Sequence, residues 1–385
     1  RDLVRSRGLG DVYKRQDRMS KKIALITATL LGGGVERVMI NLAEAIHAKD
    51  GYETVLVVIS DVEGQPTHQP PQDVPVMYLH KKRVVTSVAA LQNLFKEHHW
   101  DGIITAQEHV NVALWLAMKM EKVSIPWLPV VHSTLSMSLK KSPYLLDKLL
   151  IPVVRWLYPR LKKIGAVSLG VKEDLVSKFG LASEQVISLP NPVISNTILR
   201  DSVNFEDNQR FDQLVAAGRL VPEKGFDVLI RAFHIFSQAN DYSLIILGEG
   251  PEREHLEMLI KELGLMRRVL LPGFMPDPYP YMRSAKLFVL SSRYEGLPTV
   301  LIEAMAYGTP VAATDCRSGP AEILDGGRYG VLVPVDDPQA LAEGMSQALQ
   351  HPVASQALRA RALGYSYEGN IDYYLEMLKE PVCHE

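Results

Sequence analysis

Residues 291–310 read SSRYEGLPTVLIEAMAYGTP, and this stretch decides the fold. The apolar run at 287–290 before it predicts a buried strand, and a loop containing glycine and proline follows. Thr299 is predicted to cap a helix that runs through Tyr307, and the apolar run at 310–313 predicts the next strand. This order of elements places the loop at the carboxyl end of a parallel strand, where open α/β sheets bind ligands.

Two carboxylates occupy different positions in this stretch: Glu295 lies in the loop and Glu303 on the helix. A loop that leads into a helix N-terminus presents unpaired N–H groups, which attract phosphate. Carboxylates beside such a site cannot bind the phosphate, but they can accept hydrogen bonds from the hydroxyls of a sugar or a ribose. The pattern therefore favours a nucleotide-sugar, whereas an isolated pair would indicate a solvated loop residue and a charge on a helix surface.

The two glutamates and the residues around them resemble the E-x7-E signature of the family 4 (group 1) retaining glycosyltransferases. The resemblance implies an α/β protein of the GT-B fold, in which two Rossmann-like domains face each other across a cleft. It also implies that Glu295 contacts the transferred sugar and that Glu303 contacts the ribose of the nucleotide. The loop between them is expected to bind substrate through Gly296, Leu297, Pro298 and Thr299.

A second motif supplies positive charge. The run at 213–220 predicts a strand with Arg219 near its end, and Lys224 follows in the loop before a predicted helix. Two cations at a strand exit suit a diphosphate, because Arg offers a planar fork and Lys a compact charge. Residues 218–225, GRLVPEKG, match the family's G-R-L-x-x-x-K-G turn, in which both cations hold the donor pyrophosphate. The sequence has no Asp-x-Asp triplet, and we expect no metal and no other cofactor.

A glycine-rich turn at Gly33 and Gly34 joins a predicted strand to a predicted helix in the first half of the chain. It is not a dinucleotide fingerprint, because Arg37 stands where the third glycine would be, and this counts against a dehydrogenase. Taken alone, the motif is as compatible with a tight turn that binds nothing as it is with a ligand-binding turn. In the resembled family the turn lies beside the donor phosphates and the acceptor site.

Two further strand exits carry candidate residues. His132 follows the apolar run at 129–131, and a lone histidine there is usually a structural hydrogen-bonding group. The family keeps a histidine at the equivalent place, near the transferred sugar, so we expect His132 to be catalytic. Gly273 and Phe274 end another apolar run, and in the family this exit borders the nucleotide base.

The composition indicates a soluble globular protein of two domains: the chain has 385 residues, of which 47% are hydrophobic and 22% charged. Its two cysteines, Cys316 and Cys383, are too few for a disulfide framework and agree with a reducing cytosol. No uninterrupted apolar run reaches the roughly 18 residues of a membrane-spanning helix. We expect a cytoplasmic location and no nucleic-acid partner.

Four segments are expected along the chain. Residues 1–18 are basic and lack apolar periodicity, so they are expected to be extraneous and disordered. Residues 19–195 should form the acceptor-binding domain and residues 196–364 the nucleotide-sugar-binding domain, with the boundary at a proline-rich exit. Residues 365–385 should form a terminal helix that crosses back onto the first domain, as in the resembled family.

The segment Leu139–Lys163 interleaves seven cations with apolar and aromatic residues. Such a segment can lie on an anionic membrane surface or guide a pyrophosphate-lipid acceptor, which suggests peripheral association with the inner face of the plasma membrane. The alternative is a helix packed on the sheet with a solvated lysine face. We favour this alternative, because Pro143, Pro152 and Pro159 are expected to break the segment.

The resemblance implies a metal-independent, hexosyltransferase-type enzyme that moves a sugar from a nucleotide-sugar donor to a saccharide or lipid-linked acceptor. A UDP-sugar is the preferred donor by family frequency, and synthesis of cell-surface polysaccharide is the preferred context. Two rivals stay open: a GT-B sugar-nucleotide epimerase, and a non-catalytic protein that binds sugar nucleotides or a partner enzyme.

Overall fold

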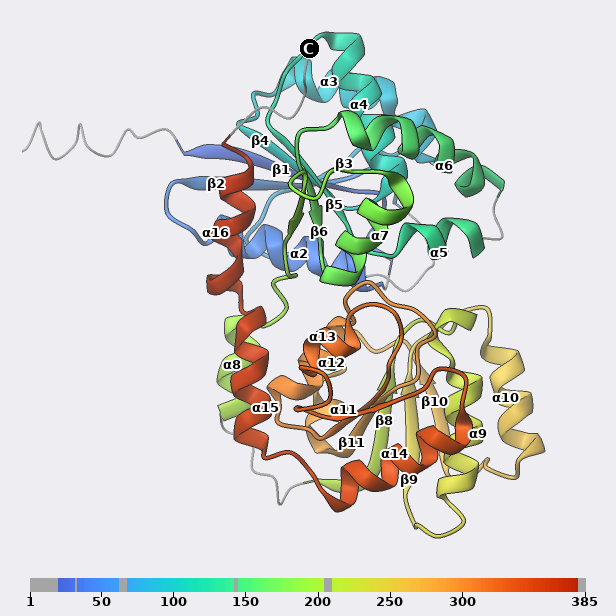
Figure 1. The fold of residues 1–385 in the computed structure, drawn as a ribbon. Helices are drawn as coiled ribbons and strands as arrows, with labels where there is room; N and C mark the ends of the chain where they lie inside the picture. The colour runs from blue at the N-terminus through green and yellow to red at the C-terminus, as the bar shows by residue number, and fades with distance from the viewer. Residues whose placement is uncertain (1–19, 32, 62–67, 142–144, 204–209, 380–385) are drawn as a thin grey trace, which may run out of the picture.

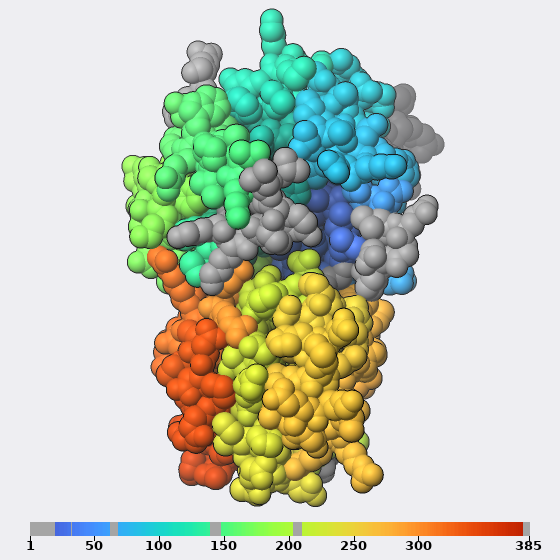
Figure 2. Space-filling model, turned by 90° about the vertical axis from the view of Figure 1, so that its right-hand side faces the viewer, coloured from blue at the N-terminus to red at the C-terminus, as the bar shows by residue number. Residues whose placement is uncertain are grey.

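The computed structural model describes residues 20–31, 33–61, 68–141, 145–203 and 210–379, so the predicted N-terminal segment 1–18 lies outside the described residues. The described chain forms two halves, each built on a parallel sheet with helices packed on it (Figure 1). Seen from the side, the halves form two lobes stacked one above the other (Figure 2).

The first half contains a seven-stranded parallel sheet in the order β3-β2-β1-β4-β5-β6-β7. Its strands read as continuous apolar runs because helices cover both faces, and residues 23–26 and 56–59 are fully buried. The strands are β1 (Lys21–Thr27), β2 (Tyr52–Val58), β3 (Val76–Tyr78), β4 (Gly102–Thr105), β5 (Trp127–Val131), β6 (Ile164–Ala166) and β7 (Val186–Ser188). The α-helices are α2 (Gly34–His47), α3 (Val88–Glu97), α4 (Glu108–Glu121), α5 (Leu135–Lys141), α6 (Leu145–Leu157) and α7 (Leu169–Phe179).

The second half repeats the design with a six-stranded parallel sheet in the order β10-β9-β8-β11-β12-β13. The strands are β8 (Phe211–Ala217), β9 (Ser243–Leu247), β10 (Val269–Gly273), β11 (Ala285–Leu290), β12 (Val311–Thr314) and β13 (Val331–Val333). The helices are α8 (Asn196–Val203), α9 (Phe226–Phe236), α10 (Arg253–Glu262), α11 (Tyr279–Ser284), α12 (Thr299–Ala306), α13 (Pro320–Ile323), α14 (Pro338–Gln350) and α15 (Ser355–Ala362). Two parallel Rossmann-like halves are the architecture that the sequence predicts.

The chain passes between the halves twice, and the two passages lie side by side. The backbone N–H groups of Val193 and Ile194 both donate to the Tyr365 carbonyl, at 2.8 and 3.0 Å. Beyond Tyr365, helix α16 (Tyr367–Met377) packs against α2 of the first half (Figure 1). At its end Leu378 fills the space over Gly102, where a Cβ atom would lie 2.9 Å from a Leu378 methyl carbon. The end of the described chain therefore packs against the first half, with α16 on α2 and Leu378 on strand β4.

Two local predictions are wrong. Thr299 does not cap α12: it is the first residue of the helix, and Pro298 before it makes no side-chain capping bond. Pro152 does not break the segment 139–163, because α6 continues through it. Proline has no N–H to donate to the Lys148 carbonyl, but both Pro152 and Lys148 are exposed, so this part of the helix faces solvent. Pro143 lies outside the described residues.

No helix among the described residues is long and apolar enough to cross a membrane.

Candidate active site between the two halves

The predicted loops meet where the strand order of each sheet reverses. In the first sheet this point lies between β1 and β4, and in the second between β8 and β11. The turn at Gly33 and Gly34 follows β1, Arg219 and Lys224 follow β8, and Glu295 follows β11. Crevices at such switch points are the usual ligand sites of open parallel sheets.

Gly296 brings the two halves into direct contact. A Cβ atom at this position would lie 1.9 Å from the carbonyl oxygen of His132, which belongs to the first half. The Gly296 carbonyl accepts hydrogen bonds from Ser168 of the first half at 2.8 Å and from Ser318 of the second at 2.9 Å. Only glycine leaves room for this approach, so the loop is held against the carboxyl ends of β5 and β6.

Glu295 is oriented by two hydrogen bonds within the second half. Its Oε1 accepts from Lys224 Nζ at 2.6 Å and from Ser292 Oγ at 2.6 Å, and its side chain is only 9% exposed. The Ser291 hydroxyl donates to the Lys224 carbonyl at 2.8 Å and fixes the neighbouring turn. Two residues that lie 71 positions apart thus place a carboxylate beside a cation at the boundary between the two halves, hereafter the cleft.

Glu303 lies in the second turn of α12 and is 2% exposed. Its Oε1 atom is buried and has no hydrogen-bond partner among the described residues. Burial raises the pKa of this carboxyl above its usual range, and the positive charge of Arg37 opposes the rise. A buried carboxylate oxygen without a partner is costly, and a ligand hydroxyl would satisfy it.

Arg219 is exposed, and its charge acts across the cleft on Glu36 in the first turn of α2. Glu36 accepts a hydrogen bond from Gln107 Nε2 at 3.1 Å. Burial raises the pKa of Glu36, while Arg219 and the hydrogen bond from Gln107 oppose the rise. Arg219 is therefore near enough to the start of α2 for its charge to act on Glu36.

The amino ends of two helices converge at this turn. Gly33 is the residue before α2, and a Cβ atom on it would lie 2.4 Å from Glu36 Oε2. A Cβ atom on Gly34 would lie 3.9 Å from Oγ1 of Thr299, the first residue of α12. Helix amino ends carry unpaired N–H groups and a partial positive charge, so this turn is a candidate site for an anion.

His132 follows β5, as predicted, and is partly buried. Burial lowers its pKa to about 3, so the imidazole is neutral near pH 7. A neutral ring keeps one nitrogen as a hydrogen-bond acceptor and the other as a donor. This side chain can therefore orient a hydroxyl, but it does not contribute a positive charge.

Gly273 and Phe274 lie at the exit of β10, where Gly273 has a φ of +94° that suits glycine. The Phe274 ring meets the His68 ring edge to face, with 5.8 Å between centroids. His68 Nε2 in turn bonds to the Gly33 carbonyl at 2.8 Å, so Phe274 also touches the first half. Leu297 and Pro298 lie in the loop before α12, and Leu297 is buried.

Four residues that line this interface were not predicted as site residues: Glu36, Arg37, His68 and Tyr279. Glu36 and Arg37 lie two and three residues after Gly34, so the charged pair in the sequence Gly-Gly-Val-Glu-Arg was a usable signal. His68 and Tyr279 carry no local signal, because only the packing of one half on the other brings them to the cleft.

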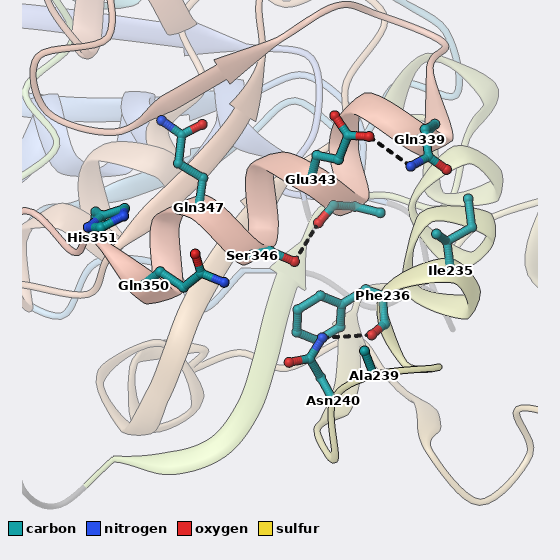
Figure 3. Close-up of a pocket in the computed structure, with 11 residues that line it drawn as sticks. Ile235, Phe236, Ala239, Asn240, Gln339, Glu343, Ser346, Gln347, Gln350 and His351 are labelled. Carbon is teal, nitrogen blue, oxygen red and sulfur yellow. Dashed lines mark hydrogen bonds between the residues drawn. The ribbon is translucent and has the colours of Figure 1, made fainter.

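A shallow groove of about 560 Å³ lies elsewhere, between the carboxyl end of α9 and helix α14 (Figure 3). Helix α9 begins beside Lys224 and runs away from the cleft, so its carboxyl end lies at the opposite edge of the sheet. The groove contains none of the predicted residues. Among the residues that the structure describes, no cluster of three His, Cys, Asp or Glu side chains could hold a metal ion.

Comparison with known proteins agrees with this geometry. The family model described as glycosyl transferases group 1 matches residues 198–365, and the glycosyltransferase family 4 model matches residues 32–196. The chain belongs to the group 1 glycosyltransferases of family 4. The two matches fall on the two halves and together cover both sides of the cleft.

Two curated relatives of this glycosyltransferase illustrate the range of similarity. A Campylobacter jejuni N-acetylgalactosamine-N,N'-diacetylbacillosaminyl-diphospho-undecaprenol 4-alpha-N-acetylgalactosaminyltransferase is 35% identical over 57% of this chain and 58% of its own length. The amylovoran biosynthesis glycosyltransferase AmsD of Erwinia amylovora is 26% identical over 94% of this chain and 97% of its own length. The matched region therefore covers less than two thirds of the length of the Campylobacter relative.

Solved structures confirm the GT-B fold. Anabaena HepE, solved with UDP and glucose, superposes with a TM-score of 0.74 at 20% identity, covering 93% of this chain and 99% of HepE. A glycosyltransferase from Rickettsia africae superposes with a TM-score of 0.73 at 17% identity, covering 94% and 98% of the two chains.

Proposed function

We propose that the cleft transfers a hexosyl group from a nucleoside-diphosphate sugar to an acceptor hydroxyl, with retention of the anomeric configuration. The observation that carries this proposal is that Glu295, paired with Lys224, and the unpartnered oxygen of Glu303 belong to α12 and the loop before it, and that the amino end of α12 meets that of α2. A sugar, a ribose and a diphosphate are the groups that these three features suit.

In the proposed reaction the bond between the anomeric carbon and the diphosphate oxygen breaks, and the acceptor oxygen bonds to the same face of that carbon. The acceptor proton passes to the leaving phosphate. Arg219 and Lys224, with the amino ends of α2 and α12, would stabilise the negative charge that develops on the diphosphate. Glu295 would orient the sugar and Glu303 the ribose. With this charge supplied by the chain, the reaction needs no metal and no other cofactor.

The donor is proposed to be a UDP-sugar. Support comes from HepE, a fold relative solved with UDP and glucose. Gly273 and Phe274, at the exit of β10, would border the base. The base and the sugar are the parts of this proposal that a donor panel decides.

The acceptor is proposed to be a glycan or lipid-linked saccharide of cell-surface polysaccharide synthesis. The name of the Campylobacter relative specifies a saccharide on diphospho-undecaprenol, and AmsD is named for amylovoran biosynthesis. A lipid-linked acceptor would bring the enzyme to the inner face of the plasma membrane.

An exposed apolar ridge on the first half supports this location. Helices α4 and α6 pack together, and the rings of Trp115 and Trp156 meet at 5.4 Å. The α4–α6 ridge consists of the exposed side chains Leu116, Met120, Leu149, Val153 and Trp156. On α6 these residues follow the spacing i, i+4 and i+7 of a single helix face. The exposed cations Lys148, Arg155 and Arg160 flank them, which matches an anionic bilayer.

Vesicle binding tests the membrane part of the proposal. Vesicles containing phosphatidylglycerol should sediment the wild-type protein, and vesicles of phosphatidylcholine alone should sediment much less. Leu149→Glu combined with Val153→Glu should abolish the difference. Met258→Glu combined with Met266→Glu is the matched control, because these exposed apolar residues lie in the second half. Equal sedimentation of all three proteins would refute the ridge as a membrane contact.

The catalytic part is tested by incubating the enzyme with UDP-, GDP- and ADP-sugars in the presence of EDTA and a lipid-linked saccharide. The expected result is a glycosylated product whose new linkage has the anomeric configuration of the donor, as read by NMR. An isomerised sugar nucleotide formed without acceptor would indicate the epimerase alternative. Nucleotide binding without turnover on any acceptor would indicate the non-catalytic alternative.

A further inference from the structure

Arg37 lies on α2 of the first half and reaches across the cleft to the second half. Its Nη1 donates to the Tyr279 hydroxyl at 2.9 Å, and its Nη2 donates to the Pro276 carbonyl at 3.0 Å. The guanidinium also lies over the Tyr279 ring, 5.7 Å from the centroid. These contacts join α2 to the short segment between β10 and the start of α11, which follows the proposed nucleoside-binding residues Gly273 and Phe274.

Glu303 is the acidic group on which the Arg37 charge acts. It lies on α12 and is buried, and its unpartnered Oε1 has no group in the second half that satisfies it. A buried carboxylate without a nearby positive charge is strongly destabilised. The positive charge that opposes the effect of burial on Glu303 thus comes from the opposite half, and the Arg37 bonds to Tyr279 and Pro276 hold it there in this arrangement of the halves.

Three tyrosines complete the surroundings of this pair. The rings of Tyr279 and Tyr307 are tilted by 40° with 5.7 Å between their centroids, and Tyr367 of α16 also interacts electrostatically with Arg37 and Glu303. Burial raises the pKa of each tyrosine above its usual range, so all three stay neutral near pH 7. The tyrosines therefore leave Arg37 as the charge that balances Glu303.

We propose that Arg37 is a positioning residue that couples domain closure to capture of the donor ribose: closure brings its charge to Glu303 and prepares that carboxylate to accept the ribose hydroxyls. This inference rests on the proposed function, because it takes the ligand of Glu303 to be a ribose. By reciprocity, a ribose bound to Glu303 favours the closed arrangement that Arg37 maintains. Pyrophosphate, which lacks the ribose, would bind Arg219 and Lys224 without this coupling.

The test compares the affinities of UDP and inorganic pyrophosphate by calorimetry for wild type, Arg37→Gln and Glu303→Gln. A hydrogen bond to a charged group corresponds to about a 10- to 100-fold change in affinity. We expect Arg37→Gln to lower the affinity for UDP by about this factor. Its pyrophosphate affinity should stay within about twofold of wild type. The double variant should lose little more than either single variant, because both act on the same contact.

Two further variants keep the test decisive. Lys49→Gln is the control, since Lys49 also joins the α2 region to α16, through an exposed ion pair with Asp372 at 2.8 Å, and should change neither affinity. Tyr279→Phe removes one Arg37 contact at minimal change in volume. It should weaken UDP binding more mildly than Arg37→Gln does, and it serves as the test if Arg37→Gln does not fold. Equal weakening of UDP and pyrophosphate, or unchanged UDP affinity in Arg37→Gln and Tyr279→Phe, would overturn the inference. Wild-type turnover of a nucleotide-sugar would leave the proposed function intact in either case.

Discussion

Replacing Gly296 with alanine should separate the two halves of the cleft. The backbone at this residue does not have a positive φ, so alanine causes no local strain. The added Cβ would lie 1.9 Å from the His132 carbonyl oxygen. An ordinary contact between carbon and carbonyl oxygen is about 3.4 Å, so the two loops must move apart by about 1.5 Å. Displacements of about 1 Å can cost roughly 100-fold in rate, and we expect Gly296→Ala to lower kcat/KM by about this factor.

The assay is the initial rate of sugar transfer across a range of donor concentrations, with the melting temperature measured in parallel. Gly364→Ala is the matched control, because no atom lies within 4 Å of the position that its Cβ would occupy. We expect the control to have wild-type kinetics, and both variants to melt near wild type, because neither substitution disturbs the core of a half. Small-angle scattering should show an expanded molecule for Gly296→Ala only. A folded Gly296→Ala enzyme with kcat/KM within threefold of wild type would refute the closed arrangement as the active one.

Three further predictions concern single side chains. Lys224→Met removes the cation 2.6 Å from Glu295, and kcat should fall by about 100- to 1,000-fold, as measured by nucleotide release; a fall in affinity alone would assign Lys224 to binding. Asp337→Ala removes the side-chain cap that accepts from the Ala340 N–H at 2.9 Å, and chemical denaturation should show a loss of about 1 kcal/mol with unchanged activity. The pKa of His132 is lowered to about 3 from an unfolded value near 6.5, so the unfolded state binds more protons between these values, and stability should fall as the pH drops below about 6.5. His132→Gln should flatten this acid dependence of the melting temperature, and an unchanged slope would contradict the assignment.

The fold follows from the sequence because both sheets are parallel and buried. Their strands are apolar runs bounded by glycine and proline, and such runs are visible in the local sequence. The loops at the strand ends could then be placed on one edge of each sheet without knowing any tertiary contact. This is why the positions of Arg219, Lys224 and Glu295 were predictable.

The contacts between the halves could not be read from the sequence. The bond from Arg37 to Tyr279 joins residues 242 positions apart, and the bond from Ser168 to Gly296 joins residues 128 apart. No periodicity or motif specifies such pairs, because they depend on how one rigid half docks on the other. The local error at Pro152 has a different origin, since solvent exposure lets a helix tolerate proline where a buried helix could not.

The central claim is that Glu295 of the closed cleft acts in sugar transfer from a nucleotide donor. The most direct test is nucleotide release in EDTA for wild type and Glu295→Gln, with Glu257→Gln as a control that changes an exposed glutamate paired with Arg253. We predict release from one donor by the wild-type enzyme and the control, and a loss of about 100-fold or more in Glu295→Gln with an unchanged melting temperature. Release at the wild-type rate by folded Glu295→Gln would contradict the account.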